Sequence, residues 1–301
     1  MHILGIDCGL SYNTNSSGLC QIIDQQTSAF RTFSDKLSKL EVLCLKNEVD
    51  LICVDAPLLP NSYCNKRVDG KVKRTVEILF SMGKFADRCK PGHTHSVSNY
   101  DGNKKMKGNI GYGLRRAGGE VVSQFIEYLG SLQQQTLSIP RVESNVNFIE
   151  TFPNLVLGII LDDKDYGKPL IAKKEDRDTF DRLFDYCQKN MLFSKLQLAS
   201  NFVNHSIWTS LKSETDHEKR AALICSLIGI FVYYGHYVAI GDDDSGYFFL
   251  PPVDFWGNWV KQALQDNLEK YWNKNTSKNS IIIWVNGEEH TILQGEYALP
   301  I

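Results

Sequence analysis

The chain has 301 residues, 43% of them hydrophobic and 23% charged, and its formal net charge is −2 at pH 7. This length and composition support one large core or two modest ones and exclude an intrinsically disordered protein. The near-neutral charge excludes a uniformly basic surface, so binding a polyanion would need a local basic patch. No run approaches the roughly 18 apolar residues of a membrane span, and the first residues enter a strand instead of a signal peptide. We therefore expect a cytoplasmic protein that does not enter a membrane.

Two short apolar segments each run into an aspartate. Residues 2–6 precede Asp7, and residues 51–54 precede Asp55. Pro57 cannot continue a central strand, so the second strand ends near Asp55. Four apolar residues in a row are typical of a strand buried on both faces, as in a parallel sheet. Open α/β sheets bind ligands at the carboxyl ends of their strands, which makes both aspartates candidate site residues.

The segments between these strands predict how they are arranged. Residues 19–23 and 29–33 predict two further strands. Residues 35–48 carry leucines at helical spacing, and a helix that leads into the next strand makes a right-handed crossover. In this order the first and last strands can lie side by side, which would bring Asp7 and Asp55 together.

A third strand that ends in an acid is predicted at residues 146–150, where Pro153 closely follows Glu150. In a sheet of this type Glu150 would lie at the same edge as Asp7 and Asp55. The alternative is a structural role, since a glutamate at a strand end is often a helix cap or a salt-bridge partner.

The clearest helix follows Thr215. Residues 215–218 have the Ser/Thr-x-x-Glu form of a capping box, and residues 221–234 are almost entirely apolar until Gly235. Such a helix is buried all round, so its polar groups gather in the first turns. Asp216 and Glu218 are both candidates there. If Glu218 bonds back to the amide of Thr215 it cannot bind a ligand freely, and Asp216 becomes the better candidate.

The order of these features resembles the ribonuclease H-like fold: a Gly-Ile-Asp-x-Gly opening, three strands, a helix and a strand that ends in aspartate. Further segments, in the same order, resemble the DUF429 family of predicted nucleases over residues 1 to about 255. These segments are residues 54–58, 111–115, 149–153, 173–174, 217–225, 241–242, 246–247 and 250–252.

The resemblance implies an α/β fold with a mixed sheet and flanking helices. The expected domain is 1–255, with a basic insertion at about 61–110 and a helical one at about 155–212. A helix and a strand at 256–301 extend it. In ribonuclease H-like enzymes the last metal-binding carboxylate comes from a C-terminal helix, which implies Glu218, although aspartate is commoner at this point.

The chemistry of these acids would be phosphodiester cleavage. Two divalent ions activate a water and stabilise charge on the attacking and leaving oxygens, and carboxylates from separate elements can hold them. Mg²⁺ or Mn²⁺ is expected, because both prefer oxygen ligands. The expected ligands are Asp7, Asp55, Glu150 and Glu218, with Asp216 as the alternative on the helix.

A local basic patch is present at residues 61–110, where lysines and arginines are interleaved with aromatic residues. Such surfaces hold a phosphate backbone and stack bases, although a run of charge is as often only a solvated face. The expected nucleic-acid contacts are Arg67 within this patch and, outside it, Arg115, Arg116, Lys174 and Arg220.

Three alternatives stay open beside the nuclease. A nucleic-acid-binding module could keep the fold without catalysis, given Glu218 in place of aspartate. An actin-like ATP-binding kinase would share the first strand and the Asp-x-Gly-x-Ser turn from Asp7 to Ser11, but no second phosphate loop is evident. A structural or partner-binding protein would show no acidic cluster. The sequence leaves open DNA or RNA as the partner, and the oligomeric state.

Overall fold

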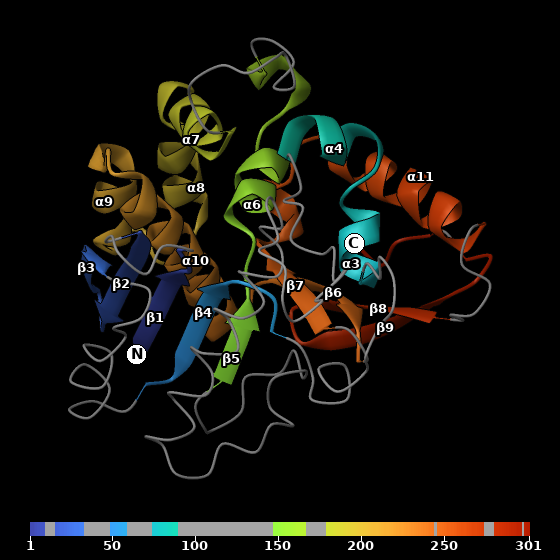
Figure 1. The fold of residues 1–301 in the computed structure, drawn as a ribbon, viewed down its shortest axis with the longest axis horizontal. Coiled ribbons are helices and arrows are strands. Elements are labelled where there is room, and N and C mark those ends of the chain that lie inside the picture. Colours follow the sequence, from blue (N-terminus) through green and yellow to red (C-terminus); the bar gives the residue numbers. More distant parts are fainter. Residues whose placement is uncertain are drawn as a thin grey trace, which may run out of the picture.

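The computed structural model describes residues 1–9, 16–32, 49–58, 74–89, 147–166, 179–243, 246–273, 280–296 and 298–301. It is a mixed α/β fold with two sheets (Figure 1). The first sheet has five strands in the order β3-β2-β1-β4-β5. Their bounds are β1 His2–Asp7, β2 Ser17–Ile23, β3 Gln26–Thr32, β4 Leu51–Asp55 and β5 Asn147–Glu150.

The first sheet is parallel in its centre. β1, β4 and β5 run parallel, while β2 is antiparallel to both β1 and β3. Every apolar residue of β1 and β4 is buried, as expected for strands covered on both faces. The predicted pairing of the first strand with the strand at 51–55 is confirmed. The helix predicted at 35–48 lies outside the described residues.

One long helix, α10 (His217–Tyr233), packs across β1, β2 and β4. Figure 1 shows it behind these strands. Its close approach requires glycine in the sheet, because a Cβ atom at Gly5 would lie 2.2 Å from the Oγ of Ser226 and 2.3 Å from the carbonyl oxygen of Ala222. Residues 220–232 of the helix are all buried or nearly so, as the continuous apolar run predicted.

The second sheet has four antiparallel strands in the order β7-β6-β8-β9. They are β6 Val238–Asp242, β7 Gly246–Leu250, β8 Ser280–Val285 and β9 Glu288–Leu293. Because β8 pairs with β6, the expected boundary at residue 255 divides this sheet. Asn286 and Gly287 form the turn between β8 and β9, with φ of 51° and 86°. Asn-Gly is the pair that a type I′ hairpin turn requires.

The remaining helices complete one continuous core. They are α3 Thr75–Leu79, α4 Gly83–Cys89, α6 Pro153–Ile159, α7 Thr179–Lys189, α8 Leu192–Ala199, α9 Ile207–Ser213 and α11 Val260–Trp272. Side chains such as Leu183, Phe193 and Trp208 from the expected helical insertion join the same core as the first sheet. Among the residues that the structure describes, no helix has both the length and the apolar character that crossing a membrane requires.

Candidate functional site

A row of four residues crosses the first sheet at the carboxyl ends of β1 and β4. Asp55 is the register partner of Asp7, Asp7 of Gly18, and Gly18 of Arg31. Neighbouring strands lie about 4.8 Å apart, and partners in register point their side chains to the same face. Gly5, two residues before Asp7, faces α10, so the whole row does. The structure therefore brings Asp7 and Asp55 together on the face that α10 covers.

The environment of Asp55 favours its neutral form. Burial raises the pKa of Asp55 to about 7, and the negative charge of Glu150 contributes in the same direction. Cys225 of α10 lies close to the pair, since Asp55 and Asp7 both add to the increase in its pKa that burial causes. Its sulfur lies 2.9 Å from the Oγ1 of Thr151, which donates a hydrogen bond to it. The Cys225 thiol therefore stays protonated at neutral pH and is no nucleophile.

Glu150 lies at the same edge of the sheet but belongs to the other face. Its register partner is Val54, so it is one residue out of step with Asp55. Arg74 donates to both carboxylate oxygens of Glu150, at 2.7 Å and 2.5 Å, and the amide of Leu58 donates a third hydrogen bond at 3.1 Å. Glu150 is therefore a salt-bridge partner, which is the structural alternative that the sequence left open for it. Burial raises the pKa of Glu150, and Arg74 opposes this increase.

Arg74 is a site residue that sequence reasoning missed. Its side chain is 2% exposed and forms ion pairs with both Glu150 and Glu77. Its guanidinium group also lies over the ring of Phe248, 5.5 Å from the ring centre. The only signal was the spacing of Arg74 and Glu77, which places an arginine and a glutamate three residues apart at the start of α3.

The two acids at the start of α10 face a different arginine. Glu218 lies 2.8 Å from Arg31, and Asp216 lies 3.6 Å from the same guanidinium group. The predicted capping box is wrong, because α10 begins one residue later than a box at Thr215 requires. Asp216 is the cap, accepting from the amide of Lys219 at 3.2 Å. Glu214 accepts a hydrogen bond from the amide of Thr215, at 2.9 Å.

Arg220 lies in an internal network instead of on a ligand-binding surface. It is 5% exposed and donates to the carbonyl oxygen of Glu214 at 2.9 Å. It pairs with Asp181 and Asp185 of α7 and stacks on Phe184, 4.6 Å from the ring centre. Arg220 thus ties the start of α10 to α7. The other expected nucleic-acid contacts, Arg67, Arg115, Arg116 and Lys174, lie outside the described residues.

The structure does not bring the four expected metal ligands together. Within the described ranges, no three acidic, histidine or cysteine side chains come together in a way that could hold a metal ion. Asp7 and Asp55 are neighbours, whereas Glu150 is paired with Arg74 and Glu218 with Arg31. Two carboxylates still suit Mg²⁺, which usually keeps several waters and takes one or two carboxylates together with phosphates of the substrate.

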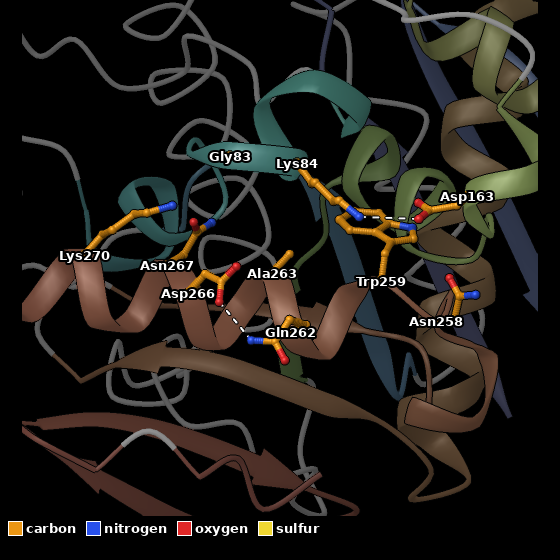
Figure 2. A pocket seen from close by; sticks show the side chains of 10 residues that line it. All are labelled: Gly83, Lys84, Asp163, Asn258, Trp259, Gln262, Ala263, Asp266, Asn267 and Lys270. Carbon is orange, nitrogen blue, oxygen red and sulfur yellow. Dashed lines mark hydrogen bonds and ion pairs between the residues drawn. The ribbon is translucent and has the colours of Figure 1, made fainter.

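A pocket of about 390 Å³ lies away from this row, between α4 and α11 (Figure 2). Its charges are balanced. Lys84 lies 3.4 Å from Asp163, and Asp266 accepts a hydrogen bond from Gln262 at 2.9 Å. The lining therefore favours neither an anionic nor a cationic ligand. It consists of Gly83, Lys84, Asp163, Asn258, Trp259, Gln262, Ala263, Asp266, Asn267 and Lys270.

Compared with known proteins, the chain matches no family model, no curated protein and no solved structure. The resemblance to the DUF429 family therefore stays a prediction.

Proposed function

We propose that the chain is a metal-dependent nuclease of the ribonuclease H-like type, in which Asp7 and Asp55 hold Mg²⁺ or Mn²⁺. One observation carries the proposal: the two aspartates are register partners at the carboxyl ends of adjacent parallel strands. This edge is where open α/β sheets bind their ligands. The strand order supports the same fold type, because three consecutive antiparallel strands are followed by a parallel strand that ends in aspartate.

The electrostatics of the pair favour a cation. Two carboxylates on neighbouring strands repel each other when both are charged. Burial, together with the negative charge of Glu150, adds to the cost of ionising Asp55. A divalent cation bound between them would relieve both costs. The bound ion would acidify a water molecule and stabilise charge on the oxygens of a phosphodiester, which is the chemistry that hydrolysis requires.

A second function, a nucleic-acid-binding module of the same fold, is favoured by a different observation. Two of the four expected ligands are engaged by arginines, Glu150 by Arg74 and Glu218 by Arg31. A fold that had lost catalysis could keep these pairs and bind nucleic acid without a metal.

The test is cleavage of labelled single- and double-stranded DNA and RNA in Mg²⁺ or Mn²⁺, with wild type, Asp7→Asn and Asp55→Asn. Asp254→Asn is the matched control, because Asp254 is an exposed aspartate outside the row. We expect each site variant to lose at least the roughly hundredfold that removal of one electrostatic group costs a catalytic site. Cleavage that persists in both site variants would overturn the proposal. Binding of nucleic acid without cleavage by wild type would favour the binding module.

A further inference from the structure

Glu218 stands between the aspartate pair and Arg31. A Cβ atom at Gly18 would lie 1.9 Å from the carbonyl oxygen of Glu218, so the backbone of Glu218 passes directly over Gly18. The neighbours of Gly18 in the row are Asp7 on β1 and Arg31 on β3. The backbone of Glu218 therefore lies over the strand that separates Asp7 from Arg31.

In the structure the side chain of Glu218 points toward Arg31. Its Oε1 lies 2.8 Å from the Nη2 of Arg31, whose Nη1 lies 3.6 Å from Asp216. Arg31 is 42% exposed and Glu218 18%. Ion pairs that solvent reaches contribute little to stability, so this pair can exchange partners readily. The buried pair of Arg74 and Glu150 has no such freedom.

We propose that Arg31 is a positioning residue that holds Glu218 away from the metal site until a phosphate of the substrate binds Arg31. This inference rests on the proposed function. A guanidinium group binds two phosphate oxygens at once, as it does a carboxylate, so a phosphate can replace Glu218 as its partner. Glu218, released from Arg31, turns toward Asp7 and becomes the third carboxylate of the site. Binding of the substrate then completes the metal site.

The test measures Mn²⁺ affinity without nucleic acid, from the electron paramagnetic resonance signal of free Mn²⁺. The variants are Arg31→Gln, Glu218→Gln and the double variant, with Asp7→Asn as the reference for loss of the site. Arg31→Gln should bind Mn²⁺ about tenfold more tightly than wild type. This is the smaller end of the change in metal affinity that substitutions around a metal site cause. Glu218→Gln alone should bind like wild type, and the double variant should lose the gain.

The double-mutant cycle separates a new ligand from a general change in charge. A change in charge alone makes Glu218→Gln weaken Mn²⁺ binding equally in wild type and in Arg31→Gln, and that outcome overturns the inference. If Arg31→Gln binds Mn²⁺ with the affinity of wild type, the inference is also overturned. If Asp7→Asn loses Mn²⁺ binding in the same experiment, the proposed function is still supported. If wild type and Asp7→Asn bind Mn²⁺ equally or not at all, the proposed function fails and the inference falls with it.

The phosphate contact has its own measurement. Short labelled DNA and RNA oligonucleotides are titrated by fluorescence anisotropy in EDTA, so that no metal takes part. We expect Arg31→Gln to bind more weakly by about threefold to tenfold, as the loss of one phosphate contact predicts, and Arg31→Lys to retain part of the affinity. If Arg31→Gln and wild type bind the oligonucleotides with equal affinity, phosphate is not the group that releases Glu218.

Discussion

Two groups of carboxylates lie at one edge of the first sheet, on opposite faces. On the face away from α10, Glu150 and Glu77 share Arg74, and all three side chains are at most 5% exposed. On the face under α10, Asp7 and Asp55 are partners in register, and burial raises the pKa of Asp55 to about 7. The difference follows from a single step in register. Glu150 pairs with Val54 instead of Asp55, and this step sends its side chain to the face where Arg74 lies.

The largest expected effect belongs to the buried arginine. Arg74→Met would leave Glu150 and Glu77 together in the core without a cation, and breaking such a pair costs about 3–5 kcal/mol. Urea unfolding of wild type and variant, followed by circular dichroism, measures the difference. A loss below about 1 kcal/mol, the range of exposed pairs, would contradict a structural role for this cluster.

This contrast shows how far the sequence predicts the site. The strands at β1 and β4 were predictable, because each is a short apolar run that ends at an aspartate, and their pairing follows from the order of elements. The register of β5 was not, since it depends on how a strand from far along the chain is placed beside β4. Arg74 was hidden for another reason: arginine is mostly exposed, and the spacing of Arg74 and Glu77 suggests an ion pair without marking it as buried.

Beyond the site, local sequence is enough to predict only part of the second sheet. The hairpin of β6 and β7 is local and follows from two apolar runs around a turn. The pairing of β8 with β6 joins segments separated by α11, which no local pattern specifies. The strand β9 had a local signal, the Asn286-Gly287 turn, which predicts a hairpin there.

The second prediction compares one acid from each face. Asp55→Asn should weaken Mn²⁺ binding by about tenfold or more, since an outer partner of a metal site is already worth that much and a ligand should cost at least as much. At about pH 8, where Asp55 is ionised with or without the charge of Glu150, Glu150→Gln should change it by less than about threefold, because Glu150 faces Arg74. Isothermal titration calorimetry gives both values.

The control for this comparison is a thermal melt of each variant. Glu150→Gln removes a charge from a buried pair, so its affinity is read only at temperatures where circular dichroism shows the native fold. An equal loss of affinity in the two variants would place Glu150 in the metal site, against the register of β5.

The third prediction concerns pH. Because the pKa of Asp55 is raised to about 7, a metal ion must displace a proton from Asp55 below that pH. Mn²⁺ affinity should therefore fall by about tenfold for each pH unit below 7, a factor that corresponds to one proton. In Asp55→Asn the slope should be close to zero. A slope that persists in this variant would assign the proton to another group.

The same pKa fixes the sign of a change in stability without metal. The unfolded chain has an ordinary aspartate pKa of about 3.9, so folded Asp55 keeps its proton to a higher pH than unfolded Asp55. Its contribution to stability is complete below about pH 4 and is lost as the pH rises through about 7. Wild type should therefore lose more stability than Asp55→Asn when urea unfolding is compared at about pH 5 and about pH 8.

The smallest effect is expected for the exposed arginine, and it completes the comparison. Arg31→Gln breaks a pair with Glu218 that solvent reaches, so the free energy of unfolding should change by less than about 1 kcal/mol in the urea measurement used for Arg74→Met. Two arginines, each bound to two carboxylates at one end of the same sheet, would then differ severalfold in what they contribute to stability. A loss of more than about 2 kcal/mol for Arg31→Gln would make Arg31 a structural clamp like Arg74. A clamp could not release Glu218, because its partner would be held by the fold itself.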